Sequence, residues 1–269
     1  MIEPQRRDPR ELPDANTLRD ALKARLRTHT PALFFDFDGT LAPIVARPDM
    51  AAPSDAMQAV IARLGTKMRT AIISGRDRQD ARERLGVPDL VYAGSHGFDI
   101  EGPGGIRHLA GEDYLPMLDD AEAALTERFQ DIEGVLIDRK RFAIAVHFRA
   151  VAPDRHDDVA RRVAQIDDTF PRLQCKSGKM IWELQPRFDW HKGKAIAWLL
   201  DAWPAPDRPW LPFYFGDDVT DEDGFAAVAE TGMGILVDPG DRPTSAKATL
   251  PDVESVRVFL EGLERAIAL

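Results

Sequence analysis

The sequence predicts an α/β protein with a parallel-sheet core, into which a smaller α+β unit is inserted. Three times in the first part of the chain, a short apolar run ends in a turn of Gly, Ser or Asp residues, and helical stretches separate these runs. That alternation is typical of right-handed βαβ units in a parallel sheet. Between residues 109 and 186 the order changes to helix, two strands, helix, two strands, which indicates an antiparallel sheet.

The first part of the chain supplies three strands and the helices between them. The strand at 32–35 is a continuous apolar run, as in a parallel strand that is buried on both faces. It ends abruptly in Asp36-Phe37-Asp38-Gly39-Thr40, whose Asp and Gly residues favour a turn. The expected elements, in order, are a helix at 18–26, the strand at 32–35, a helix at 54–64, a strand at 70–73, a helix at 78–85 and a strand at 90–93.

The strands of the inserted segment alternate apolar and polar residues, as a sheet does when one face packs on helices. The polar face would carry Arg149, Lys179 and Glu183, which can bind sugar hydroxyls, whereas His147 suits a structural hydrogen bond equally well. We expect Ser177-Gly178 to form a two-residue turn. The expected elements are a helix at 113–130, strands at 135–138 and 142–149, a helix at 153–169, and strands at 173–176 and 179–185.

After Pro186 the chain returns to alternating strands and helices. The elements expected there are a helix at 192–202, a strand at 213–215, a helix at 222–230, a strand at 234–237 and a helix at 253–268. The predicted core therefore consists of residues 28–108 and 187–269, and a predicted substrate-specificity cap consists of residues 109–186.

Composition narrows the possible partners and compartments. The formal net charge of −10 argues against a nucleic-acid or anionic-membrane partner, because both need a cationic surface. Apolar runs are all shorter than the roughly 18–20 residues of a membrane-spanning helix. The single cysteine, Cys175, fits a reducing cytoplasm, and its surroundings indicate a strand residue rather than a nucleophile.

Polar side chains follow four of the predicted core strands. These are Asp36 and Asp38, Ser74 and Arg76, Ser95 and His96, and Asp217, Asp218 and Asp221. The carboxyl ends of parallel strands meet at one edge of a sheet, where ligands bind in such folds. Carboxylates gathered there repel one another unless a cation lies among them, and their hard oxygen atoms suit Mg²⁺.

Four segments resemble the conserved motifs of the haloacid-dehalogenase-like (HAD) phosphatase superfamily, in the same order along the chain. They are Phe34-Phe35-Asp36-Phe37-Asp38-Gly39-Thr40-Leu41, Ile73-Ser74-Gly75-Arg76, Lys192-Gly193-Lys194-Ala195 and Gly216-Asp217-Asp218-Val219-Thr220-Asp221-Glu222. The resemblance implies a Rossmann-like HAD core with an inserted αββαββ cap of the C2 type.

Further segments are similar to those of the trehalose-6-phosphate phosphatase family within this superfamily. They are Gly94-Ser95-His96-Gly97, Ala145-Val146-His147-Phe148-Arg149 and Gly178-Lys179-Met180-Ile181-Trp182-Glu183-Leu184-Gln185-Pro186. This similarity covers about residues 30–260. It implies hydrolysis of trehalose 6-phosphate to trehalose and phosphate in trehalose biosynthesis, and a functional link to a trehalose-6-phosphate synthase.

The resemblance also implies roles for individual residues. Asp36 would be the nucleophile that forms an aspartyl-phosphate, and Asp38 the general acid and base. Ser74 and Lys192 would hold phosphoryl oxygens, and Lys192 stands at a helix start, where a cation is otherwise disfavoured. Mg²⁺ would be held by Asp36, Asp38 and Asp217, with Asp221 or Asp218 in support. The implied substrate-binding residues are Asp36, Asp38, Gly75, Arg76, His96, Gly97, Arg149, Lys179 and Glu183.

Two alternatives to this function stay open. The chain could be another sugar phosphatase with this type of cap, such as a sucrose-phosphate phosphatase or a phosphomannomutase-like enzyme. It could also be a non-catalytic sugar-phosphate-binding or regulatory module, as phosphatase-like domains fused to synthases can be. The presence of Asp36, Asp38, Lys192 and Asp217 argues against this second alternative.

Overall fold

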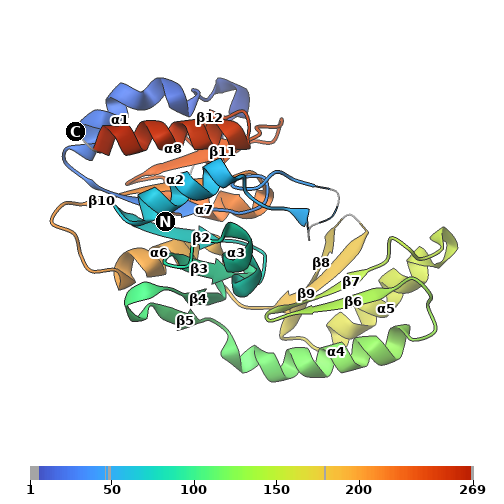
Figure 1. The fold of residues 1–269 in the computed structure, drawn as a ribbon. Coiled ribbons are helices and arrows are strands. Elements are labelled where there is room, and N and C mark those ends of the chain that lie inside the picture. Colours follow the sequence, from blue (N-terminus) through green and yellow to red (C-terminus); the bar gives the residue numbers. More distant parts are fainter. Residues whose placement is uncertain (1–5, 46, 48–49, 179, 268–269) are drawn as a thin grey trace. The chain divides into compact units, whose positions relative to one another are not determined.

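The computed structural model of the chain describes residues 6–45, 47, 50–178 and 180–267. The chain forms two compact units, one made of Met1–His108 with Trp190–Leu269, and the other of Leu109–Asp189 (Figure 1). We call the first the core unit and the second the inserted unit. Residues before 28 belong to the core unit, where helix α1 (Arg19–Leu26) packs on helix α8 (Val253–Ile267).

The described part of the core unit contains an eight-stranded sheet in the order β12-β11-β10-β1-β2-β3-β4-β5. The strands from β12 to β3 pair in parallel, and β4 pairs antiparallel to β3. The parallel core that the sequence predicts is therefore confirmed. The strands are β1 (Thr30–Phe35), β2 (Arg69–Ile73), β3 (Val91–Gly94), β4 (Asp99–Glu101), β5 (Arg107–Leu109), β10 (Trp210–Gly216), β11 (Met233–Val237) and β12 (Ala248–Leu250).

Helices cover both faces of this sheet, so successive residues of a central strand enter different hydrophobic clusters. In β1, Leu33 and Phe35 pack toward α1, α2 and α8, whereas Ala32 and Phe34 pack toward α6 and α7 (Figure 1). Burial on both faces explains the continuous apolar run of this strand. The remaining core helices are α2 (Asp55–Gly65), α3 (Arg78–Leu85), α6 (Lys192–Ala202) and α7 (Glu222–Val228).

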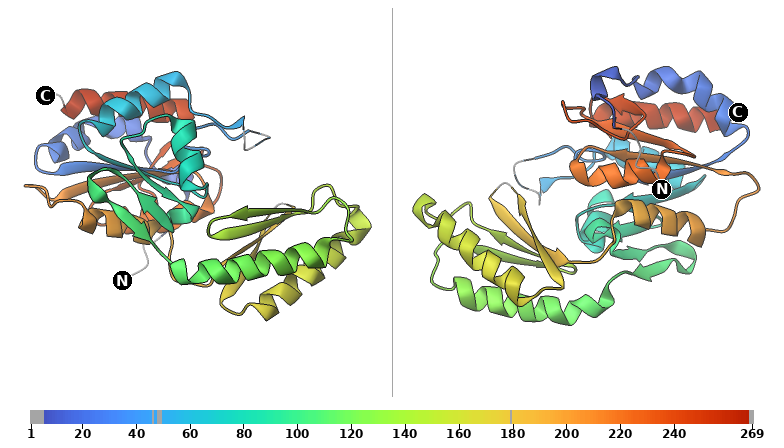
Figure 2. Two further views of the ribbon diagram at one scale, coloured as in Figure 1. Left: turned by 60° about the horizontal axis from the view of Figure 1, so that its bottom comes forward. Right: turned by 180° about the vertical axis from the view of Figure 1, so that it is seen from behind.

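The inserted unit has an antiparallel sheet with two helices on one face (Figure 2). The side chains of Ile144, Val146 and Leu184 point to these helices and pack with Leu118 and Leu125. The alternation of the sequence correctly predicts this face. The elements are α4 (Leu115–Phe129), β6 (Leu136–Lys140), β7 (Ala143–His147), α5 (His156–Thr169), β8 (Leu173–Gly178) and β9 (Ile181–Pro186), with the strands in the order β6-β7-β9-β8.

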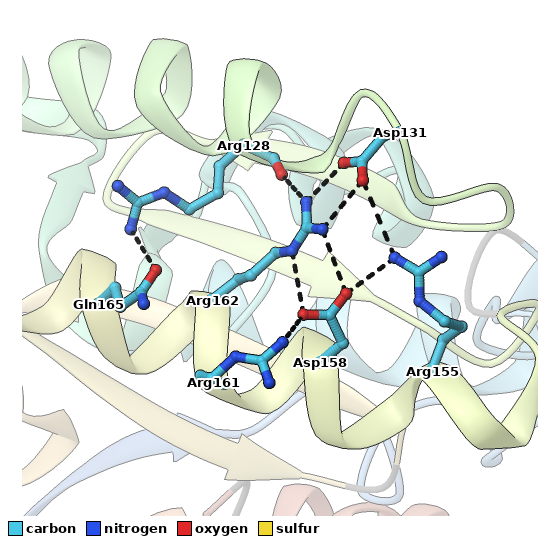
Figure 3. A network of polar contacts seen from close by, with 7 residues as sticks. All are labelled: Arg128, Asp131, Arg155, Asp158, Arg161, Arg162 and Gln165. Carbon is cyan, nitrogen blue, oxygen red and sulfur yellow. Dashed lines mark hydrogen bonds and ion pairs between the residues drawn. The ribbon is translucent and has the colours of Figure 1, made fainter.

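A network of charged groups joins α5 to the end of α4 (Figure 3). Arg162 donates hydrogen bonds to both carboxylate oxygens of Asp131 and to the backbone carbonyl of Arg128. Hydrogen bonds from Arg155 and Arg162 lower the pKa of Asp158 to about 2. Both helices are thus tied by groups that stay ionised at neutral pH, in addition to their apolar contacts.

Short 3-10 turns connect several of these elements. They are η1 (Pro9–Glu11), η2 (Ala15–Leu18), η4 (Ser95–Gly97), η5 (Pro103–Gly105), η6 (Glu112–Tyr114), η7 (Pro153–Arg155) and η8 (Val219–Asp221).

The structure corrects two predicted strand limits in the inserted unit. Ser177 and Gly178 do not form the turn between β8 and β9, because both still pair with β9. Met180, just before β9, takes a positive φ of 64°. The predicted strand to Arg149 ends at His147, so Arg149 lies in an exposed turn. The sequence also gave no signal for β4, β5 and β12, each three residues long.

Shortening Leu125 to alanine should destabilise the inserted unit by about 2–5 kcal/mol, because the fully buried side chain would leave a cavity between the helices and the sheet. Thermal and urea unfolding monitored by circular dichroism measures this loss. Glu127→Ala, an exposed change on the same helix, should stay within about 0.5 kcal/mol of the wild type. Equal effects of the two changes would contradict the packing described for α4.

Candidate active site

The carboxyl ends of β1 and β10 bring two aspartates to the same edge of the core sheet. Asp36 follows β1, and its backbone N–H donates to the carbonyl of Phe215 on β10 at 2.8 Å. Asp217 directly follows the last residue of β10. Because these strands are parallel neighbours, both aspartates leave the sheet side by side. Asp36 is only 7% exposed.

Lys192 is a buried cation at the first residue of α6, with a side chain that is only 2% exposed. Its Nζ lies 3.0 Å from Oδ1 of Asp36 and 2.6 Å from Oδ1 of Asp221. Burial lowers the pKa of the ammonium, but the two carboxylates outweigh this effect and raise the pKa above its usual value. The side chain therefore stays charged, which provides a fixed positive group beside Asp36.

Asp221 is fully buried and anchors the turn after β10. Its Oδ1 accepts hydrogen bonds from Lys192 and from the hydroxyl of Tyr214, and its Oδ2 accepts from the backbone N–H groups of Asp217 and Asp218, both at 2.9 Å. These four bonds use the lone-pair sites of a carboxylate. Asp221 is thus suited to support the site. Sequence reasoning missed Tyr214, although a buried tyrosine hydroxyl needs a polar partner.

Asp217 contacts the loop that carries Asp36 and Asp38. A Cβ atom at Gly39 would lie only 2.0 Å from Oδ2 of Asp217, and Gly39 has a φ of +77°. Only glycine meets both conditions, so Gly39 lets the Asp217 carboxylate approach the loop that carries Asp36 and Asp38. The other oxygen, Oδ1 of Asp217, is buried and accepts no hydrogen bond from any described residue.

The acidic groups at this edge fit a divalent cation. Carboxylate oxygens of Asp36, Asp217 and Asp221 lie within 4.8 Å of one another. Burial raises the pKa of Asp36 to about 7 despite Lys192, and burial with the charges of Asp36 and Asp221 raises the pKa of Asp217 to about 8. A hard cation would offset this repulsion and satisfy the buried Oδ1 of Asp217.

Arg76 binds Asp38 rather than pointing freely into the site. Its Nε and Nη2 donate to the two oxygens of Asp38 at 2.7 and 2.6 Å, and its Nη1 donates to Asp80 at 2.8 Å. The guanidinium carbon lies 5.2 Å from the centre of the Phe37 ring. The sequence predicts Arg76 as a substrate-binding residue. In the structure its guanidinium binds Asp38, the predicted general acid, instead.

Backbone hydrogen bonds connect the residues that follow β2 with those that follow β3. The N–H of His96 donates to the carbonyl of Ser74 at 2.8 Å, and the N–H of Ser95 donates to that of Arg76 at 2.8 Å. Ser95 and His96 both have positive φ, which is strained for residues with side chains. The His96 ring lies against Gly75, where a Cβ would be 2.8 Å from it. Ser74, Gly75 and His96 are thus in contact with one another, and Gly97 ends the same turn, η4.

The three predicted sugar-binding residues, Arg149, Lys179 and Glu183, belong to the inserted unit, and their surroundings differ. Glu183 is half-buried on β9, where Lys140 lies 3.4 Å from Oε1 and Gln185 donates to Oε2 at 2.7 Å. Arg149 lies in the exposed turn after β7. Lys179 lies outside the described residues. Of these three, only Glu183 is held in a polar cluster by the residues that the structure describes.

Comparison with known sequences decides the family. The profile of the trehalose-phosphatase family matches residues 34–254, which is most of the chain. The chain belongs to the trehalose-phosphatase family. It is 41% identical over 256 residues to a trehalose-phosphate phosphatase of Mycobacterium marinum, a match that covers 90% of this chain. The chain spans 65% of the length of that relative, slightly less than two thirds.

Solved structures of this family share the fold. The C-terminal domain of Candida albicans trehalose-6-phosphate phosphatase superposes with a TM-score of 0.73 at 25% identity, over 96% of this chain and 98% of that domain. A trehalose-6-phosphate phosphatase related protein gives a TM-score of 0.71 at 28% identity, over 87% and 97% of the two chains. The predicted HAD-like fold is therefore confirmed. None of the helices in the described residues is long and apolar enough to cross a membrane.

Magnesium affinity should rise with pH between about 6 and 8 and then level off. Cations bind the ionised carboxylates, whereas Asp36 and Asp217 hold protons below their raised pKa values of about 7 and 8. Calorimetric titration with MgCl₂ at several pH values, in buffers of different ionisation enthalpy, measures both affinity and proton release. Affinity that does not change over this range would contradict the raised pKa values. Asp217→Asn should weaken Mg²⁺ binding and remove the share of the proton release that comes from Asp217, while Asp36 still titrates.

Proposed function

We propose that the chain is a phosphatase that hydrolyses trehalose 6-phosphate to trehalose and inorganic phosphate. The observation that carries this proposal is the buried pair of Asp36 and Lys192, next to Asp217, in a member of the trehalose-phosphatase family. The relatives named for this activity match most of the chain. A nucleophile, a fixed cation and a cation-binding carboxylate are the groups that phosphoryl transfer requires.

The reaction would proceed in two displacements at phosphorus. In the first, a carboxylate oxygen of Asp36 attacks the phosphorus, the bond from phosphorus to the sugar oxygen breaks, and Asp38 donates its proton to that oxygen. In the second, Asp38 takes a proton from water, the water oxygen attacks the phosphorus, and the bond to Asp36 breaks. Phosphate leaves, and both aspartates return to their starting state.

Magnesium would be held by the carboxylates of Asp36 and Asp217 and by the backbone carbonyl of Asp38, with Asp221 in support. When bound, it supplies charge neutralisation for the phosphoryl oxygens. Lys192 supplies a second positive charge, and its bond to Asp221 keeps it at a fixed position beside Asp36. Ser74, which is buried at the end of β2, would donate a hydrogen bond to a phosphoryl oxygen.

The inserted unit would select the sugar, as a substrate-specificity cap. Glu183 is the best-placed residue for this role, because Lys140 and Gln185 fix both of its oxygens while each oxygen keeps a further lone pair for a sugar hydroxyl. Arg149, in the turn after β7, would add a contact, and Lys179 would be a further sugar-binding residue. A disaccharide phosphate offers hydroxyls on a remote ring, and their binding energy can support the chemical step.

The wider role follows from the substrate. The reaction that supplies a phosphorylated disaccharide is a glycosyl transfer to a sugar phosphate, so we infer a functional link to a trehalose-6-phosphate synthase in trehalose biosynthesis. The net charge of −10 and the lone Cys175 fit a cytoplasmic enzyme without nucleic-acid or membrane partners. No described feature favours a sucrose-phosphate phosphatase, a phosphomannomutase-like enzyme or a non-catalytic module.

Release of phosphate from a panel of sugar phosphates tests the proposed activity. We expect Mg²⁺-dependent hydrolysis of trehalose 6-phosphate, at least tenfold faster than that of sucrose 6-phosphate or glucose 6-phosphate, and none in chelator. Asp36→Asn should reduce phosphate release to background with an unchanged circular dichroism spectrum, because it removes the nucleophile at nearly constant volume. A preference for sucrose 6-phosphate would replace the proposed substrate, and activity of Asp36→Asn above a few per cent would overturn the mechanism.

Replacing Glu183 by alanine should lower kcat/KM for trehalose 6-phosphate by roughly 10–1,000-fold, the scale of losing hydrogen bonds to a charged group and the positioning they support. Hydrolysis of para-nitrophenyl phosphate, which has no sugar, should stay within a few-fold of the wild type. Glu127→Ala removes a matched, exposed glutamate of the same unit and should leave both substrates unaffected. Equal losses on both substrates would show that Glu183 supports the fold instead.

A further inference from the structure

The contact between Arg76 and Asp38 suggests a role that differs from substrate binding. Asp38 is exposed enough to reach a ligand, with 42% of its side chain accessible, yet both of its oxygens accept hydrogen bonds from Arg76. Arg76 itself is only 11% exposed. An arginine that binds substrate would keep its N–H donors directed to solvent. The guanidinium of Arg76 instead donates hydrogen bonds to the carboxylates of Asp38 and Asp80.

Arg76 is held in place from several sides. Asp80, in the first turn of α3, accepts from Nη1 of Arg76 at 2.8 Å and from Nε of Arg84 at 2.6 Å. The Phe37 ring, which is fully buried, lies against the guanidinium. The backbone of Arg76 is fixed too, because its N–H donates to Oγ of Ser74 at 3.1 Å and its carbonyl accepts from Ser95 at 2.8 Å.

We propose that Arg76 is a positioning residue, which orients the carboxyl group of Asp38 for proton transfer to and from the reacting oxygen. This inference rests on the proposed function. The fork of Nε and Nη2 fixes the plane of the carboxyl group through two parallel hydrogen bonds. Each carboxylate oxygen has a second lone pair, so Asp38 can still exchange a proton with the substrate oxygen or with water. Arg76 remains protonated throughout and does not compete for that proton.

Asp80 belongs to the same chain of hydrogen bonds that positions Asp38. Arg84 orients Asp80, Asp80 orients Arg76, and Arg76 orients Asp38. Changes at Asp80 should therefore act through Arg76, and the effects of Arg76→Ala and Asp80→Ala should not add. Lysine cannot replace Arg76, because it is a single point charge without the planar fork.

The test compares an alkyl phosphate, which needs a proton on its leaving oxygen, with para-nitrophenyl phosphate, which leaves without one. The value of kcat/KM reports the steps up to the first irreversible one, here the release of the leaving group. For trehalose 6-phosphate, Arg76→Ala and Arg76→Lys should lower kcat/KM about 100-fold, the scale of misplacing a reacting group by about 1 Å. For the aryl phosphate, both variants should stay within about threefold of the wild type.

Arg82→Ala serves as the matched control, because Arg82 is an exposed arginine on the same helix. It should leave both substrates unaffected, and Asp80→Ala should show a smaller loss with the same preference for the alkyl phosphate. Equal losses on the two substrates, or full recovery with lysine, would overturn the inference and make Arg76 a phosphate-binding charge. If the wild type accepts another sugar phosphate in place of trehalose 6-phosphate, only the proposed substrate fails, and the same comparison is made with that ester. A wild type that hydrolyses no phosphate ester would overturn both.

Discussion

The site depends on one buried ammonium group, Lys192, shared by two carboxylates. A lysine that is 2% exposed would be severely destabilising alone, and its bonds to Asp36 and Asp221 make its burial possible. The dependence is mutual, since removing one member of such a buried group typically costs about 3–5 kcal/mol by leaving a charge without its partner. Asp36, Lys192 and Asp221, which anchors the turn after β10, therefore form one electrostatic unit.

This unit also explains why the site needs several elements of the core at once. Asp36 comes from the end of β1, Lys192 from the start of α6, and Asp221 from the turn after β10. Asp221 fixes the backbone of Asp217 and Asp218, and so sets where the Asp217 carboxylate meets the loop at Gly39. A parallel sheet supplies this convergence, because the carboxyl ends of neighbouring strands lie at one edge.

Strong local patterns made most of the fold predictable. The apolar run before Asp36 and the alternation from Phe142 to Phe148 identify their strands, and strand ends locate the acidic cluster. The three-residue strands β4, β5 and β12 are too short to show a period. The turn predicted at Ser177-Gly178 was wrong because pairing with β9 continues through the glycine, a tertiary effect. Partners of Arg76 and Tyr214 likewise depend on contacts across the fold, and residue identity alone does not specify them.

The place where the inserted unit joins the core has a consequence for folding. His108 and Trp190 are the last and first core residues around the insertion, and their rings lie tilted against each other with centroids 4.9 Å apart. The ring of Trp198 in α6 stacks on His108 with centroids 4.7 Å apart. Trp190 also donates to the carbonyl of Gly97 at 2.8 Å. The two ends of residues 109–189 therefore lie close together, and the insertion forms a closed loop attached to the core unit. The entropy of closing a loop grows only slowly with its length, and a segment that folds by itself brings its own ends together. The core topology can therefore carry an insertion of this size, and β1 and β10 can pair, without a large entropic penalty.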